Sequence, residues 1–307
     1  MSPRTTKKTV TPDTVTSAPE VTEVVSKSVI QMIEENYPCP KEEEIGFHIE
    51  PAIWKLLVRN VMRGESTLLI GPTGSGKTEL VSHLTECMEI SLSIQDMGTI
   101  QDPQSALLGV HRIGKDKTSV FDPAPFVGYI QKEGVILLDE LNRAPLSASN
   151  ILFSCLDSRK YVALDVAEEG GERRIHVNPK TVFFATANLG AEYSGTNAID
   201  RALLDRFFPI ELSYPEESVE TKILIMRTNV DEKNAKGIVK VAKEVRKQFT
   251  KGDLSNTISV RHTLQAASLV ADGFTILEAL NYTIMPLFDN SDGSEERAKI
   301  KSIIAAF

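Results

Sequence analysis

A glycine-rich segment that ends in a lysine and a threonine carries the strongest chemical signal in the sequence. It reads Gly71-Pro72-Thr73-Gly74-Ser75-Gly76-Lys77-Thr78 and matches the pattern G-x-x-x-x-G-K-[ST]. Glycines let backbone N–H groups turn toward phosphate oxygens, which the lysine neutralises while the Thr78 hydroxyl can bind Mg²⁺. The segment therefore predicts a nucleoside triphosphate site. A dinucleotide fingerprint is disfavoured, because Glu79 stands where its third glycine belongs.

Two adjacent carboxylates follow an apolar run further along the chain. Residues 135–138 are Val-Ile-Leu-Leu and lead into Asp139 and Glu140, which places both at the carboxyl end of an expected buried strand, where ligands of open parallel sheets bind. We expect Asp139 to hold hydrated Mg²⁺ and Glu140 to orient and deprotonate the attacking water. Alone, such a pair is more often a helix cap. Its combination with the glycine-rich segment favours catalysis.

Three further polar positions could complete such a site. Asn188 ends another apolar run and could position the water or form a turn. Arg201 and Arg206 would point about 140° apart on a continuous helix, so they cannot easily share one phosphate. Arg261 is expected in the first turn of a helix capped by Ser259, where the helix dipole disfavours a cation unless an anion binds. At each arginine, the alternative is a surface or carboxylate-paired side chain.

The elements that must position these residues indicate an α/β fold. Runs of continuous rather than alternating hydrophobicity are typical of strands covered on both faces, hence of a parallel sheet between helices. We expect five such strands, helices at 21–33 and from Pro51, and a hairpin at 161–166 and 173–177 around Gly170-Gly171. The five strands are expected at 67–70, 90–94, 135–138, 181–185 and 207–212.

The later segments are helix-like, which suggests three parts for the chain. We expect a disordered tail at 1–20, because this stretch is rich in Thr and Pro and lacks apolar periodicity. An α/β nucleotide-binding domain with its N-terminal helix is expected at 21–212. An all-helical lid domain is expected at 213–307.

Composition narrows the classes of protein that fit. The 34 Lys+Arg and 42 Asp+Glu give a net charge of −8, and 41% of residues are hydrophobic, close to the average for soluble proteins. This argues against a nucleic-acid coat, and no run approaches the roughly 20 apolar residues of a membrane-spanning helix. The three cysteines and five histidines are scattered, so we expect no disulfide framework and no structural metal. The simplest location is the cytoplasm.

The order of these motifs resembles that of an AAA+ ATPase. The motifs are GPTGSGKT, LLDELNRA, FFATAN, ALLDRF and SVRH, followed by the expected helical lid. Within that class, LLDELNRA and the hairpin after it resemble the MoxR-type ATPases. The stretches 184–188, Tyr193-Ser-Gly-Thr196 and Leu204-Asp-Arg206 are especially similar to the AAA+ subunit of aerobic cobaltochelatase. The resemblance covers about residues 45 to 290, so it leaves the tail out.

The resemblance implies a role for each motif residue. It implies that Lys77 and Thr78 bind ATP and Mg²⁺, that Asp139 is the Walker B acid and that Glu140 is the catalytic carboxylate. It also implies that Asn188 is sensor 1 and that Arg261 is sensor 2. Arg206 matches an arginine finger, with Arg201 as a lower-ranked alternative.

An arginine finger acts on the γ-phosphate of the neighbouring subunit, so the resemblance also implies a ring, most often a hexamer. Family members commonly work with a von Willebrand factor A domain protein, inserting metals or activating enzymes. The basic stretch His111, Arg112, Lys115 and Lys117 stands where such proteins have a substrate-facing insert. We interpret it as a solvated charged loop.

Three functions remain open from the sequence. The first is an ATP-driven, chaperone-like or chelatase-type motor acting on a protein client. The second is a nucleic-acid motor or GTP-using restriction-type module, suggested by the Lys/Arg-rich helix at 233–251, whose basic side an amphipathic lid helix also explains. The third is a nucleotide-gated scaffold with little turnover, against which the presence of both Asp139 and Glu140 argues.

Overall fold

The chain folds around a five-stranded parallel sheet with the strand order β2-β5-β8-β1-β9. The computed structural model describes residues 27–113, 117–164, 174–188, 199–289 and 295–306. The sheet strands are β1 (Thr67–Ile70), β2 (Leu92–Asp96), β5 (Gly134–Asp139), β8 (Thr181–Ala187) and β9 (Phe208–Glu211). Each coincides with an expected strand to within two or three residues. The predicted α/β class, with a parallel sheet between helices and a helical C-terminal region, is confirmed.

Several sequence-based predictions lie outside the described residues. They are the tail at 1–20, the first residues of the helix expected at 21–33, Lys115, the Gly170-Gly171 turn and the stretch 193–196.

Both faces of the sheet are covered by helices, because alternate strand residues point to opposite sides. On one face, Leu69, Leu137 and Phe184 pack with α3 (Pro51–Arg63) and α4 (Lys77–Cys87). On the other, Leu68, Leu138 and Phe183 pack with α5 (Pro125–Ile130) and α6 (Leu146–Leu156). This two-sided burial explains why the strands are apolar without alternation.

The N-terminal helix is anchored to the first of these faces. α1 spans Val29–Asn36 and begins with a capping box at Ser28, later than the expected 21–33. Its Ile33 is fully buried, and the indole Nε1 of the buried Trp54 donates a hydrogen bond to the carbonyl of Tyr37, 2.9 Å away. A short helix, α2 (Glu42–Ile45), then leads to α3.

The prediction of a loop around His111 and Arg112 was wrong. Residues around His111 and Arg112, expected as a solvated loop, form an antiparallel hairpin of β3 (Gly109–Ile113) and β4 (Ser119–Pro123). Cross-strand pairing stabilises it, since Arg112 Nε lies 2.8 Å from Asp122 Oδ2. The side chain of Arg112 is nevertheless 72% exposed. The second hairpin, β6 (Tyr161–Ala163) with β7 (Arg174–His176), was expected from the sequence.

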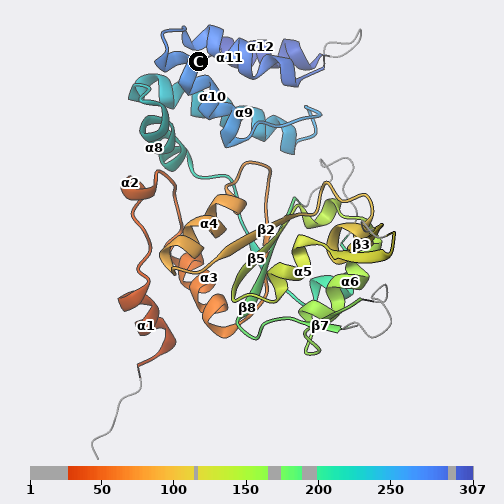
Figure 1. Ribbon diagram of the computed structural model, residues 1–307. Coiled ribbons are helices and arrows are strands. Elements are labelled where there is room, and N and C mark those ends of the chain that lie inside the picture. The colour runs from red at the N-terminus through yellow and green to blue at the C-terminus, as the bar shows by residue number, and fades with distance from the viewer. Residues whose placement is uncertain (1–26, 114–116, 165–173, 189–198, 290–294, 307) are drawn as a thin grey trace, which may run out of the picture.

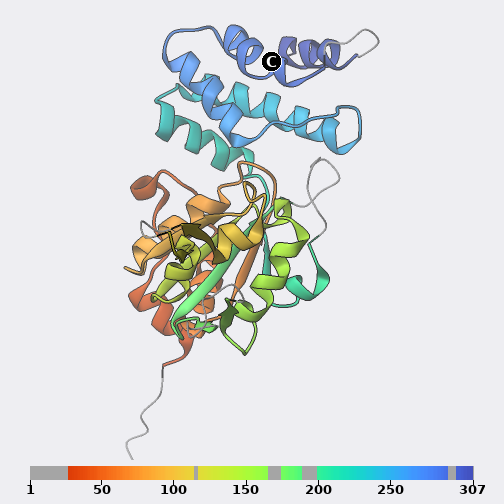
Figure 2. The same cartoon turned by 45° about the vertical axis from the view of Figure 1, so that its right-hand side comes forward.

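The C-terminal helices form their own layer above the α/β core (Figures 1 and 2). They share a separate apolar core that includes Ile238, Val241 and Val245 of α9. The Lys/Arg-rich side of this helix is thus the solvated side of an amphipathic helix. Among the described residues, no helix is long and apolar enough to cross a membrane. The layer consists of α8 (Glu217–Thr228), α9 (Glu232–Thr250), α10 (Val260–Ala271), α11 (Ile276–Thr283) and α12 (Glu296–Ala305).

Short helical segments lie between the longer helices and strands. They are η1 (Gln104–Leu108), η2 (Leu141–Arg143), α7 (Arg201–Leu204) and η3 (Met285–Leu287).

A buried ion pair joins three helices of this C-terminal layer. Glu220 of α8 is fully buried, and Arg246 of α9 donates to both its carboxylate oxygens at 2.6 and 2.9 Å. Thr263 of α10 also donates to Glu220, at 2.8 Å. Arg246 further donates to the carbonyl of Ile258 at 3.0 Å, and its guanidinium lies 4.1 Å from the Tyr214 ring centroid. The pair therefore fixes the start of α10 against α8 and α9.

Removing the arginine should destabilise the helical layer strongly. In Arg246→Met, Glu220 keeps its buried position but loses its cation, which typically costs about 3–5 kcal/mol. We expect a matching loss in the free energy of unfolding, measured by urea denaturation followed by circular dichroism. Lys243→Met is the matched control, because Lys243 pairs with Glu217 on the surface of the same two helices. A midpoint for Arg246→Met equal to that of the control would contradict the assignment.

Candidate active site

A cleft of about 1060 Å³ opens between the sheet edge and the helical layer. Because the strands are parallel, β1, β5 and β8 all end at this edge, so the segments that follow them meet there. The lining includes the glycine-rich segment, the ends of β5 and β8, and residues of α8 and α10. The sequence motifs from distant parts of the chain are thus brought together in one place.

The glycine-rich segment connects β1 to α4 and adopts backbone angles that suit glycine. Gly74 and Gly76 have φ values of +74° and +83°, in the left-handed region. A Cβ on Gly76 would lie 2.3 Å from the Phe47 ring. The hydroxyl of Ser75 is buried and has no hydrogen-bond partner. A phosphate oxygen would satisfy this hydroxyl, and the N-terminus of α4 faces the same loop, so the segment fits a phosphate group.

Lys77 is a buried cation at the bottom of the cleft. Its side chain donates to the carbonyls of Gly71 and Pro72 at 2.8 and 2.9 Å and to Asn188 Oδ1 at 2.7 Å. Burial lowers the pKa of Lys77 to about 8, although the nearby Asp139 acts in the opposite direction. The predicted phosphate-binding lysine and the predicted sensor Asn188 are therefore in direct contact.

Thr78 and Asp139 lie together as expected for a magnesium site. The Thr78 hydroxyl is 3.2 and 3.3 Å from the two carboxylate oxygens of Asp139. Thr186, at the end of β8, also donates to Asp139. Hydroxyl and carboxylate oxygens are ligands that Mg²⁺ prefers, and this ion commonly keeps several waters. The donor set thus fits hydrated Mg²⁺.

Glu140 adopts an unusual backbone conformation. Its φ and ψ are 55° and 44°, a left-handed conformation that costs a non-glycine residue about 1–3 kcal/mol. Its backbone N–H donates to Thr186 Oγ1 at 2.9 Å, and its carboxylate lies 3.3 Å from Arg143 Nε. A Cβ on Gly98 would lie 2.7 Å from that carboxylate. The Glu140 carboxylate therefore lies beside the segment after β2, and the residue lines the cleft together with Asp139.

Asn142 supports the site but was missed from the sequence. Its side chain donates to the Asn188 carbonyl at 2.7 Å and accepts from the Asn188 N–H at 3.4 Å. It is buried and lies within the LLDELNRA motif, which could have identified it. These contacts hold the backbone of Asn188, whose side chain faces Lys77.

Arg261 comes from the helical layer and lies over the glycine-rich segment. As expected, α10 begins at Val260 with Ser259 as its N-cap. A Cβ on Gly74 would lie 2.8 Å from the Ser259 Cβ and 3.7 Å from the Arg261 Cγ. Arg261 therefore lines the cleft from above, at a helix N-terminus where an anion would offset the unfavourable dipole.

Arg201 and Arg206 do not line this cleft. Arg201 is exposed in α7, which ends at Leu204, so the continuous helix assumed for the two arginines does not exist. The Arg206 guanidinium carbon lies 4.7 Å from the Phe153 ring centroid and Nη2 lies 3.8 Å from Asp157. Its Nε is buried without a hydrogen-bond partner. Neither arginine is among the residues that line the cleft with the glycine-rich segment.

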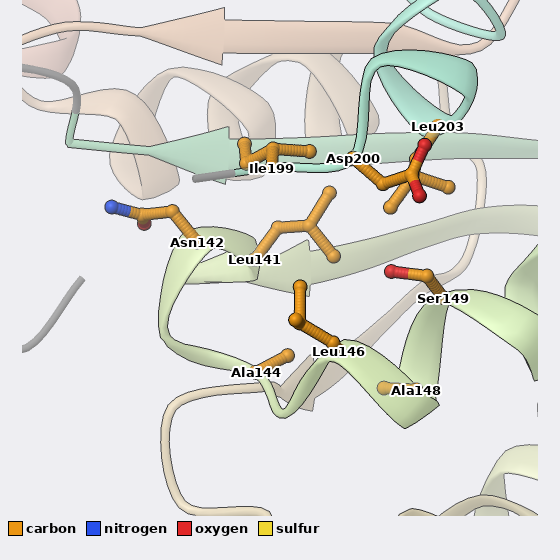
Figure 3. A pocket seen from close by; sticks show the side chains of 9 residues that line it. All are labelled: Leu141, Asn142, Ala144, Leu146, Ala148, Ser149, Ile199, Asp200 and Leu203. Atoms are coloured by element: carbon orange, nitrogen blue, oxygen red, sulfur yellow. The ribbon is translucent and has the colours of Figure 1, made fainter. Parts of the chain in front are cut away.

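A second pocket lies beside α7 but is too small for a ligand. Its volume is about 10 Å³, and roughly 10–15 Å³ is needed to hold one water. Figure 3 shows Ile199, Asp200 and Leu203 across from Leu141, Leu146 and Ser149. The pocket marks where the segment leading to Arg206 packs on the segment after Glu140.

Comparison with known proteins assigns both parts of the chain. Residues 66–207 match the AAA domain (dynein-related subfamily), and residues 220–307 match the CbbQ/NirQ/NorQ C-terminal family. BssE of Thauera aromatica, named as a candidate chaperone, is 32% identical over 70% of this chain and 72% of its own length.

Two further relatives match a similar share of this chain. The denitrification regulatory protein NirQ of Pseudomonas aeruginosa is 28% identical over 82% of this chain and 92% of its own. The gas vesicle ATPase GvpN1 of Halobacterium salinarum is 26% identical over 72% of this chain and 65% of its own. On the two family matches and the similarity to BssE, the chain belongs to the AAA+ ATPases of the dynein-related, MoxR type.

Proposed function

We propose that this chain is an ATP-hydrolysing motor that works as a hexameric ring and remodels or activates a protein client. One observation carries the proposal. Lys77, Asp139 and Glu140 meet in one cleft under Arg261, whereas Arg206 lies outside it. A site that is complete except for an arginine is the arrangement expected when a neighbouring subunit supplies that arginine.

The residues of the chain divide the work of hydrolysis. Lys77 binds the β- and γ-phosphate oxygens in exchange for its present oxygen partners, which include Asn188 Oδ1, and this leaves Asn188 free to orient the attacking water. Glu140 accepts the proton of that water as it attacks the γ-phosphorus, and the bond to the leaving ADP oxygen breaks. Arg261 compensates negative charge from the lid side. Mg²⁺, held by Thr78 and Asp139, would neutralise charge on the phosphates.

A neighbouring subunit supplies the missing cation. Arg206 stacks on Phe153 beside Asp157, so its guanidinium is oriented before a partner arrives, and a preorganised cation stabilises transition-state charge at little reorganisation cost. The ring of six and the finger role of Arg206 belong to this proposal. So does the division of the chain into a core at 21–212 and a lid at 213–307.

The relatives favour a protein client. One is named as a candidate chaperone and another as a regulator of denitrification, so we propose a cytoplasmic activator of an enzyme, working with a von Willebrand factor A domain partner. A metal-chelatase role rests on the sequence resemblance alone. The basic residues of α9 lie on the solvated side of an amphipathic helix, so they do not favour the alternative of a nucleic-acid motor.

The first test removes the proposed catalytic base. Glu140→Gln should keep ATP binding and assembly but lower phosphate release by at least about 100-fold, the usual contribution of a general base. Glu133→Gln is the matched control, since Glu133 pairs with Lys180 on the surface. Turnover in Glu140→Gln equal to the control would refute the assigned role.

The second test asks whether Arg206 acts in trans. Arg206→Ala and Lys77→Ala rings should each be inactive, but an equal mixture should recover about one quarter of wild-type hydrolysis, because one interface in four combines intact residues. Arg201→Ala alone should remain active. Absence of recovery at every ratio, with mixed rings confirmed by mass spectrometry, would count against Arg206.

A further inference from the structure

Arg227, near the end of α8, makes contacts that none of the roles above uses. Its Nη2 forms an ion pair with Glu79 Oε1, and its Nε donates to the Gly46 carbonyl at 2.8 Å. Glu79 lies in the first turn of α4, two residues after Lys77, and Gly46 ends α2. One lid side chain thus bridges the phosphate-loop helix and the segment before α3.

These contacts lie at the wall of the cleft. Arg227 and Glu79 both line the cleft, together with the apolar side chains of Phe47, Ile53 and Ile223. Flat apolar walls with a few polar groups are typical of the place where a base is bound. Lys77 and Thr78, which the proposed function places at the triphosphate, immediately precede Glu79 at the start of the same helix.

The bridge has a defined geometry on its core side. Gly46 has a φ of +62° and caps α2, which fixes the direction of its carbonyl. A second contact from the same lid helix reaches α2, because Lys222 Nζ lies 3.9 Å from Glu42. Figure 1 shows α8 directly above α2. Two cations of α8, Arg227 and Lys222, therefore contact two acidic residues of the α/β part of the chain, Glu79 and Glu42.

We propose that Arg227 is a positioning residue which holds the lid against the core at the base end of the cleft and thereby sets the rate at which a bound nucleoside triphosphate leaves. The inference rests on the proposed nucleotide-binding function. The side chains of Arg227 and Glu79 are 32% and 39% exposed, so the pair is weak enough to open and close. The Gly46 hydrogen bond adds direction to it.

The closure is transmitted to the phosphate end through the buried network of the lid. Glu220, on the same helix as Arg227, is bonded to Thr263 of α10, and α10 carries Arg261 at its start. Opening the rim at Arg227 therefore also moves Arg261 from the glycine-rich segment. Arg227, which does not contact the phosphates, thus controls the position of Arg261, which does.

Dissociation of a fluorescent ATP analogue, chased with unlabelled ATP in a stopped-flow instrument, tests the inference. Arg227→Gln and Glu79→Gln should each speed dissociation about twofold to fivefold, the scale of one partly exposed ion pair. Lys236→Met is the matched control, since Lys236 pairs with Glu232 on the exposed side of α9, and its rate should equal that of the wild type. An unchanged rate in Arg227→Gln would overturn the inference.

A reversed pair separates lid closure from direct contact with the base. In the double variant Glu79→Arg/Arg227→Glu, an ion pair can re-form, so dissociation should be slower than in Arg227→Glu or Glu79→Arg alone. Dissociation no slower than in either single variant would overturn the bridging role. Unfolding midpoints of all variants are compared with the wild type to exclude misfolding.

The proposed function is judged separately in the same experiment. Wild-type protein should bind the analogue and Lys77→Ala should not. If neither binds, the nucleotide-binding function itself is overturned, and the inference falls with it. If the wild type binds through Lys77 and the Arg227 variants match it, the inference alone fails.

Discussion

The buried ammonium of Lys77 is the constraint around which the cleft is arranged. Taking a cation out of water is costly unless oxygens replace its hydration. Here the replacements are two carbonyls of the glycine-rich segment and Asn188 Oδ1, while Asp139 adds a negative charge. These groups come from β1, β5 and β8, so the ammonium is satisfied only when the sheet has its native strand order. Since a phosphate could substitute for the same oxygens, the interaction that stabilises the folded cleft also prepares it for a ligand.

The helical layer contains a second buried charge, which holds helices in place and takes no part in the proposed hydrolysis. Glu220 and Arg246 hold α8, α9 and the start of α10 together, and α10 presents Arg261 to the glycine-rich segment. Arg227, about two turns after Glu220 in α8, then ties this layer to the α/β core. A buried ion pair thus holds the helices of this layer to one another, and a weaker, partly exposed ion pair joins the layer to the α/β core.

Much of the fold could be predicted from the sequence, because the features involved are local. Strands buried on both faces are continuously apolar, and Gly74, Gly76 and Lys77 stand in a pattern whose chemistry depends on adjacent residues.

What could not be predicted from the sequence depends on tertiary contacts. The β3–β4 hairpin is formed by antiparallel pairing of its two strands, and its exposed charged residues, such as Arg112 and Asp122, make the stretch resemble a solvated loop in the sequence. The Arg227–Glu79 bridge joins residues 148 positions apart, and its charges look like ordinary surface groups. The strained backbone of Glu140 likewise has no signature in its residue type. The roles assigned to the site residues remain predictions; they are those of Lys77, Thr78, Asp139, Glu140, Asn188, Arg206 and Arg261.

The central claim is that a site complete except for one arginine becomes active only when a second subunit supplies it. The most direct measurement is phosphate release per subunit over a wide range of protein concentrations, with assembly followed in parallel by light scattering. Activity per subunit should rise with assembly and fall toward zero on dilution. Activity per subunit that stays constant down to concentrations at which the chain is monomeric would contradict it.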